Sequence, residues 1–195
     1  MHPTNKIAAL ILAAGASRRL GQPKQLIKIN GETLLRRTAR IASEAGCDPV
    51  IVVLGFEHEK IGEGLGALLR VSTVVNPEWE QGMASSLQAG LNAVSRHAPK
   101  SVLVLVCDQP RLTTETLRSL IAHHIRSRPD ITASRYKGAS GVPAIFDRTV
   151  VPELMRLRGD QGARKIIAQQ KWRVETVEFP GGEIDVDDPA DLTSL

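Results

Sequence analysis

The stretch IAALILAAGASRRLGQPKQ, residues 7–25, joins a short apolar run to a long polar loop. Residues 7–13 are apolar throughout, which is typical of a strand that is buried on both faces of a parallel sheet. Small residues follow at 13–15, where the backbone can approach a ligand closely. Arg19 and Lys24 then add positive charge. A triphosphate needs both features, because its oxygens accept hydrogen bonds from backbone N–H groups and its departing pyrophosphate is anionic.

The rest of the chain alternates short apolar runs with longer amphipathic stretches. Further strands are predicted at residues 50–55, 70–75, 101–106, 131–134, 142–146 and 173–179. Helices are predicted at residues 33–46, 57–69, 85–97, 113–127, 148–157 and 162–170. This alternation predicts one α/β domain over residues 1–195, a three-layer α/β/α Rossmann-like fold with a mostly parallel sheet. Ligands bind such sheets at the carboxyl ends of the strands, so the functional residues are expected in the loops there.

Composition excludes several classes of function. Aromatic residues make up only 3% of the 195 residues, which argues against a nucleic-acid partner that stacks its bases on aromatic side chains. The net charge of +4 suits anionic substrates, although an ordinary solvated surface explains it equally well. The eight-residue apolar run 7–14 is too short to span a membrane, and it lacks the basic flank of a signal peptide. With two isolated cysteines, these features predict a reduced, cytoplasmic protein without a membrane partner.

The loop after the first strand matches neither common phosphate-binding motif. No Gly-Lys-Ser/Thr follows its glycine, as a P-loop requires, and the G-x-G-x-x-G spacing of dinucleotide-binding proteins is missing. The residues alone leave two interpretations open, a triphosphate-binding loop and a flexible basic loop at the edge of the sheet.

Acidic residues occur at two further positions. Asp108, in the segment CDQP (107–110), directly follows the most hydrophobic predicted strand, where its carboxylate could bind Mg²⁺ or cap the next helix. The segment IDVDDPADL (184–192) carries a second cluster. On an extended strand Asp185 and Asp187 would face the same side, as a second magnesium ligand requires. Alternatively, Asp188 starts a helix with Pro189 at its first position, and both interpretations can hold together.

Other reactive residue types are expected to be structural. His58, His97 and the pair His123–His124 lack metal-ligand spacing and are expected at the surface. Ser85–Ser86 lacks the G-x-S-x-G elbow of a hydrolase. Trp79 is expected to pack rather than stack on a base. Cys107 is expected to be a small buried side chain rather than a nucleophile.

Several blocks together resemble a known family. LAAGASRRLGQPK (12–24) closely resembles the L-A-A-G-x-S-x-R-M-G-x-x-K signature of the MobA-like nucleotidyltransferases, and most of all that of the molybdenum cofactor cytidylyltransferases. Further similar blocks follow in the family's order: NPEWEQGMASSL (76–87), CDQP (107–110), GVPAIF (141–146), GDQGAR (159–164) and DVDDPADL (185–192). The resemblance covers nearly the whole chain. Leu20 replaces the usual Met of the signature, and Ala84 replaces a usual Ser.

The resemblance implies roles for individual residues. It implies catalytic roles for Arg19, Lys24 and Asp108, with Mg²⁺ held by Asp108 and Asp187. The nucleotide would be bound by Leu12, Ala13, Ala14, Gly15, Ser17, Arg19, Lys24, Gly82, Ser85 and Ser86. The acceptor would be bound by Gly141, Pro143, Asp160 and Arg164.

The implied reaction is a Mg²⁺-dependent transfer of CMP from CTP to a molybdopterin-type, phosphorylated pterin, with a molybdoenzyme or its chaperone as a further partner. CTP is preferred because relatives that use GTP carry L-A-G-G where this chain has Ala14. The alternatives are transfer from GTP or another NTP, transfer to another acceptor as in the isoprenoid-pathway cytidylyltransferases, and a non-catalytic cofactor chaperone. An NAD(P)H oxidoreductase is a further alternative that the missing G-x-G-x-x-G motif disfavours.

Overall fold

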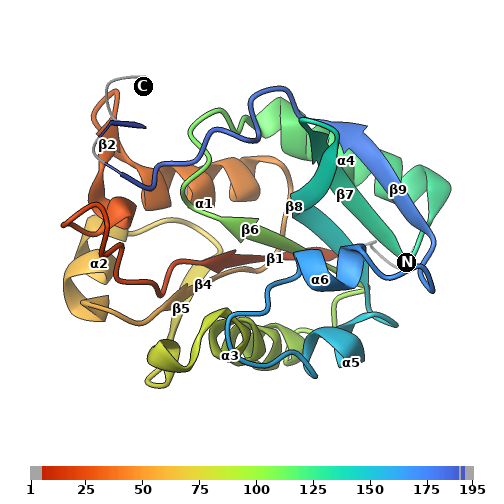
Figure 1. Ribbon diagram of the computed structural model, residues 1–195, viewed down its shortest axis with the longest axis horizontal. Helices are drawn as coiled ribbons and strands as arrows, with labels where there is room; N and C mark the ends of the chain where they lie inside the picture. The colour runs from red at the N-terminus through yellow and green to blue at the C-terminus, as the bar shows by residue number, and fades with distance from the viewer. Residues whose placement is uncertain (1–5, 189, 192–195) are drawn as a thin grey trace.

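A seven-stranded sheet in the order β5–β4–β1–β6–β8–β7–β9 runs through the centre of the molecule (Figure 1). The computed structural model describes residues 6–188 and 190–191. The strands of this sheet are β1 (Ile7–Leu12), β4 (Val50–Leu54), β5 (Val71–Val75), β6 (Ser101–Val106), β7 (Ile131–Tyr136), β8 (Ala139–Asp147) and β9 (Val174–Glu178). A separate two-stranded sheet pairs β2 (Lys28–Ile29) with β3 (Glu32–Thr33).

The strands are parallel except for β8, which is antiparallel to both of its neighbours, β6 and β7. The predicted mostly parallel sheet is therefore confirmed. Only two residues, Lys137 and Gly138, connect β7 to β8, and both have positive φ angles, of 46° and 74°. A two-residue turn with this geometry matches the twist of paired antiparallel strands. The hairpin extends both strands beyond the predicted ranges 131–134 and 142–146.

Helices cover both faces of the sheet, as predicted for a three-layer fold (Figure 1). On one face lie α1 (Leu34–Glu44), α2 (His58–Leu65) and α4 (Thr114–Ser127), and on the other lie α3 (Met83–Ser95), α5 (Val151–Leu154) and α6 (Arg164–Ile167). Two short 3₁₀ helices, η1 (Lys24–Leu26) and η2 (Trp79–Gln81), lie in loops. No helix in residues 6–188 and 190–191 has the length and apolar character that crossing a bilayer requires.

Local signals explain most helix boundaries. Thr33 caps α1 and Thr113 caps α4, each accepting a hydrogen bond from the backbone N–H three residues later. Helix α2 is shorter than predicted, because it ends at Leu65 with Gly66 at φ 63°.

The predicted helices 148–157 and 162–170 are present only as the four-residue helices α5 and α6. The carbonyl oxygens of Met155 and Leu157 accept hydrogen bonds from the Gln88 side chain, each at 2.9 Å, which hold the chain in place directly after α5. Gly159, at φ 59°, then takes the chain into a turn. Tertiary contacts and backbone conformation therefore override the local helix pattern here.

Candidate active site

A lysine ammonium lies between two carboxylates at the carboxyl end of β6. The Lys24 Nζ atom donates a hydrogen bond to Asp108 Oδ2 and another, 2.9 Å long, to Asp187 Oδ1. The Arg19 guanidinium donates to the other oxygen of Asp187, also at 2.9 Å. The fold therefore brings together three distant segments, since Asp108 lies 84 residues and Asp187 lies 163 residues after Lys24.

Backbone contacts hold the acidic segment in this place. The Val186 N–H donates to the Asp108 carbonyl oxygen at 3.0 Å. The N–H groups of Asp187 and Asp188 both donate to Asp191 Oδ2, at 2.8 and 2.9 Å. The prediction that Asp185 and Asp187 project from a strand is wrong, because residues 184–188 form a loop. Asp188 accepts from the Ala190 N–H as a cap would, whereas Pro189 lies outside the described residues.

The charges of this cluster stabilise one another. Burial alone would lower the pKa of Lys24, but the Asp108 carboxylate and the hydrogen bonds to both aspartates outweigh it and raise that pKa. The hydrogen bond from Lys24 lowers the pKa of Asp187. Partial burial and the charges of Asp108 and Asp187 raise the pKa of Asp185 to about 6. Lys24 and Asp187 are therefore both ionised at neutral pH.

The donor set suits a divalent cation. Asp108 Oδ1 is buried, and no described residue gives it a hydrogen-bond partner. Such an orphaned carboxylate oxygen is costly unless a ligand satisfies it. Asp187 adds a second carboxylate within reach of the same lysine. Mg²⁺ is commonly bound by one or two carboxylates, with the remaining positions filled by substrate phosphates and water.

A cavity of about 400 Å³ opens beside this cluster, along the carboxyl ends of β1 and β6. Nine of the predicted site residues line it: Leu12, Ala13, Ala14, Gly15, Lys24, Gly82, Ser86, Asp108 and Asp160. Arg19 and Asp187 lie beside it through their contacts with one another and with Lys24. Ser17 lines a neighbouring cavity instead. Its hydroxyl accepts a hydrogen bond from the Lys24 backbone N–H at 3.2 Å, so it stabilises the conformation of the loop 17–24.

The residues predicted to bind the acceptor are not together. Asp160 lines the same cavity as the predicted nucleotide-binding residues, and Gly82 places it there. Gly82 has φ 104°, and a Cβ atom at this position would lie 2.4 Å from the Gly159 carbonyl carbon. Only glycine permits this approach of the loop before α3 to the segment 159–160.

Gly141, Pro143 and Arg164 do not line that cavity. Gly141 and Pro143 lie on β8. A Cβ atom on Gly141 would lie 2.2 Å from the Tyr136 hydroxyl, and the Pro143 carbonyl accepts from the Ser134 hydroxyl at 2.7 Å. Arg164 is the first residue of α6, on the far face of the sheet from α1.

Several site residues were missed by the sequence analysis. Gln25 is only 1% exposed, and its amide donates at 2.8 Å to the carbonyls of both Ala13 and Gly15, which fixes the small-residue turn. Trp79, which we expected to be a packing residue, also lines the cavity and meets Phe56 edge to face. The sequence did offer a signal for each of them. Gln25 directly follows Lys24, and Trp79 lies in the block 76–87 that resembles the family.

Cys107 has the structural role that we expected. Its side chain is buried, and this burial, reinforced by the neighbouring Asp108 carboxylate, raises the pKa of the thiol to about 12. The thiol is therefore protonated at neutral pH and is a poor nucleophile.

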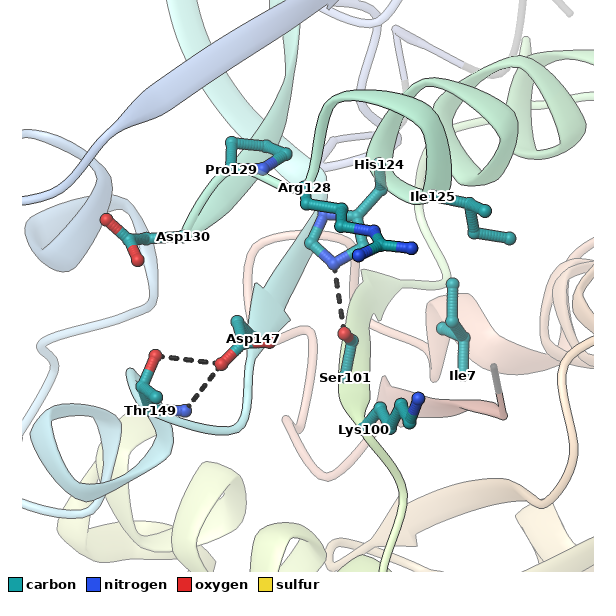
Figure 2. Close-up of a pocket in the computed structure, with 10 residues that line it drawn as sticks. All are labelled: Ile7, Lys100, Ser101, His124, Ile125, Arg128, Pro129, Asp130, Asp147 and Thr149. Carbon is teal, nitrogen blue, oxygen red and sulfur yellow. Dashed lines mark hydrogen bonds between the residues drawn. The ribbon is translucent and has the colours of Figure 1, made fainter. Parts of the chain in front are cut away.

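A second cavity, of about 390 Å³, lies at the amino ends of β1 and β6, whereas the first lies at their carboxyl ends (Figure 2). The prediction that the histidines lie at the surface is wrong for His124, which is 6% exposed and lines this cavity. Its ring nitrogens lie 2.9 Å from the hydroxyl oxygens of Ser101 and Thr132. Hydrogen bonds at both nitrogens allow the ring to be buried.

Comparison with known proteins identifies the family of this chain. Residues 9–174 match the model of the MobA-like NTP transferase domain. The chain is 32% identical over 181 residues to the "Nicotine blue oxidoreductase" of Paenarthrobacter nicotinovorans, covering 88% of this chain and 86% of the relative. It is 39% identical over 112 residues to the "Probable molybdenum cofactor guanylyltransferase" of Synechococcus elongatus, covering 57% and 55% of the two chains.

Solved structures show the same fold. The crystal structure of Rv0371c from Mycobacterium tuberculosis superposes with a TM-score of 0.84 at 33% identity and covers 97% of this chain and 96% of that one. A structure of Rv0371c in complex with manganese superposes with a TM-score of 0.79 at 30% identity, covering 97% of each chain. Since the family model spans most of the sequence and the fold agrees with it, this chain belongs to the MobA-like NTP transferase family.

Proposed function

We propose that this protein transfers CMP from CTP to the phosphate of a molybdopterin-type cofactor and releases pyrophosphate. An oxygen of the acceptor's phosphate attacks the α-phosphorus of CTP. A new P–O bond forms there while the bond from that phosphorus to the bridging β-phosphate oxygen breaks. The acceptor phosphate is already anionic, so the reaction depends on positioning and on neutralising charge rather than on proton transfer.

One observation carries this proposal: Lys24, Asp108 and Asp187 converge beside a cavity that the predicted nucleotide-binding turn lines. Lys24 and Arg19 would bind the triphosphate and neutralise the departing pyrophosphate. Asp108 and Asp187 would hold Mg²⁺. An ion held by these two carboxylates would supply positive charge that offsets the negative charge of the triphosphate.

The nucleotide would lie along the turn formed by residues 12–15 and against the loop at Gly82 and Ser86, whereas Ser85, also predicted as a nucleotide contact, does not line the cavity. Ala14 supports CTP, because its methyl group narrows the turn where GTP-using relatives carry glycine. Asp160 lies on the nucleotide side of the cavity, so we now propose it as a nucleotide contact. Gly141, Pro143 and Arg164 remain proposed acceptor residues on the strength of the family resemblance.

A panel of the four NTPs tests this proposal. Each NTP is incubated with Mg²⁺ and extracted molybdopterin, in its molybdenum-loaded and metal-free forms, while pyrophosphate and the dinucleotide product are measured. CTP is expected to give both products in equal amounts. If GTP were used as well as CTP, the preference for CTP would be wrong and only nucleotidyl transfer would remain supported. Tight pterin binding without pyrophosphate release would instead identify a cofactor chaperone.

The relative that is named as an oxidoreductase supports a second candidate, reduction by NAD(P)H. NADH and NADPH binding, measured by the change in nicotinamide fluorescence, distinguishes the two candidates. We expect no binding at concentrations at which CTP binds. Binding of NADH that CTP does not displace would favour the oxidoreductase.

A further inference from the structure

A buried asparagine beside the cavity controls the direction of one hydroxyl group. Asn76 directly follows β5 and is 3% exposed. Its Oδ1 atom accepts from the Glu78 backbone N–H at 3.0 Å. Because that N–H is only a donor, the oxygen of the amide must face Glu78, and the NH₂ group must face the other way. There it donates to Ser85 Oγ at 2.9 Å and to Ser86 Oγ at 3.0 Å.

The two serine hydroxyls consequently differ in what their own protons can do. Ser85 accepts from Asn76 and donates to the carbonyl oxygens of Glu78 and Gly82, each at 2.9 Å, so its hydrogen-bonding capacity is used inside the loop. Ser86 also accepts from Asn76, but no acceptor for its proton is found in the part of the chain that the structure describes. Ser86 is 5% exposed and lines the same cavity as Ala14 and Lys24.

We infer that Asn76 is a positioning residue that makes Ser86 a hydrogen-bond donor toward the nucleotide base. The inference rests on the proposed function, which places an NTP in this cavity. The Asn76 amide occupies the acceptor side of the Ser86 oxygen, so the Ser86 O–H is directed at an acceptor atom of the ligand. The base supplies such atoms as carbonyl oxygens or ring nitrogens, whereas the phosphates lie with Lys24.

A double-mutant cycle on CTP affinity tests this arrangement, with dissociation constants measured by calorimetry in the absence of acceptor. Ser86→Ala removes the donor and should weaken CTP binding about 5- to 10-fold, as expected for one hydrogen bond. Asn76→Asp keeps the shape and still accepts from Glu78, but its second oxygen draws the Ser86 proton away from the ligand. It should therefore cause a similar loss. In the Ser86→Ala background, Asn76→Asp should cause no further loss.

Two controls separate this role from a structural one. Asn92→Asp makes the same change of charge on the exposed face of α3 and should leave CTP affinity unchanged. Inorganic tripolyphosphate has no base, so its affinity should be the same in the wild type and in Ser86→Ala. If Asn76→Asp does not fold, Asn76→Ala completes the same cycle, because it removes the amide that orients Ser86.

Losses that multiply in the double variant would overturn the inference, since Asn76 would then act on the loop independently of Ser86. An unchanged CTP affinity in Ser86→Ala, or an equal loss of tripolyphosphate binding, would overturn it as well. If no NTP binds the wild-type protein, the proposed function itself fails. These outcomes are therefore distinguishable from one another.

Discussion

At the scale of single residues, Asp108 is the most important residue of the proposed site, because it would bind Mg²⁺ and it also accepts a hydrogen bond from Lys24. Its Oδ2 atom bonds Lys24, while its Oδ1 atom is buried without a partner among the described residues. A carboxylate with this unequal environment has one oxygen committed to the protein and one available to a ligand. Asparagine has nearly the same shape but lacks the charge.

We therefore expect Asp108→Asn to lower the turnover number about a hundredfold or more, as removal of a key electrostatic group does. The fold should survive, because the backbone contact between Asp108 and Val186 does not involve the side chain. Initial rates and the unfolding midpoint are measured together. Asp188→Asn is the matched control in the acidic segment and should keep near-normal rates. Near-normal turnover of Asp108→Asn at saturating Mg²⁺ would refute the metal assignment.

Ala14 is the residue on which our preference for CTP depends. Its side chain is 5% exposed and lines the cavity. The family resemblance gives GTP-using members a glycine at this position, and glycine differs from alanine by one methyl group. Ala14→Gly should shift the CTP:GTP ratio of kcat/KM toward GTP by about 10- to 200-fold, the effect of ~1–3 kcal/mol for one small apolar group. A looser loop would lower both values together. An unchanged ratio would show that base choice lies elsewhere.

At the scale of elements, close packing between α3 and the sheet positions the loop that lines the cavity. Gly90 lies in the middle of α3. A Cβ atom there would lie 2.2 Å from Leu10 Cδ1 and 2.8 Å from Val53 Cγ2, and both of these side chains are fully buried in strands. Helix α3 can therefore approach β1 and β4 this closely only with glycine at this position.

Gly90→Ala should lower the free energy of unfolding by about 1–2 kcal/mol, because overpacking outweighs the better helix propensity of alanine. Gly62 provides a matched control within α2. A Cβ atom at Gly62 would lie 3.6 Å from its nearest neighbour, Leu54 Cδ1, an ordinary contact. Gly62→Ala should raise the free energy of unfolding by about 0.5–1 kcal/mol. Urea denaturation measures both, and equal effects of the two substitutions would contradict the packing argument.

At the scale of the whole molecule, buried His124 links folding to pH. Burial lowers the pKa of His124 below its ordinary value of 6.5, an effect to which His123 adds and which Asp147 opposes. As pH falls through 6.5, the unfolded chain binds a proton at this residue while the folded protein does not. The folded state is therefore progressively destabilised relative to the unfolded state until the pH reaches the folded pKa.

His124→Gln should remove this contribution. The variant should be less stable than the wild type at pH 7.5, because glutamine cannot reach both Ser101 and Thr132 in the same way. The difference in the free energy of unfolding between the two proteins should be smaller at pH 5.5, because only the wild type is destabilised by protonation of His124 in the unfolded chain. Chemical denaturation at the two pH values measures this difference, and comparison of the two proteins cancels the titration of other groups. A constant difference would show that folding does not lower the pKa of His124.

The sequence alone was sufficient for the order of the seven strands of the main sheet and of the six α-helices that the structure describes, but it did not predict the small sheet of β2 and β3. Apolar runs and amphipathic periods are local properties, so they identified the strands and helices, and the order of these elements placed Lys24 and Asp108 at strand ends. Where local signals compete with packing, the predictions failed. The helices at 148–157 and 162–170 are shorter than predicted, in a region where Gln88, distant in sequence, binds the carbonyls of Met155 and Leu157 and where Gly159 turns the chain.

Only the tertiary structure decided which distant side chains meet. It placed the Lys24 ammonium between Asp108 and Asp187, brought Asp160 into the cavity lined by residues 12–15, and buried His124 in a polar network. It also fixed the Asn76 amide, whose orientation depends on three hydrogen bonds from one turn and one helix. Residue type and periodicity determine where the chain is helical or extended. The direction of a side chain is determined by groups that folding brings beside it, and no local pattern encodes them.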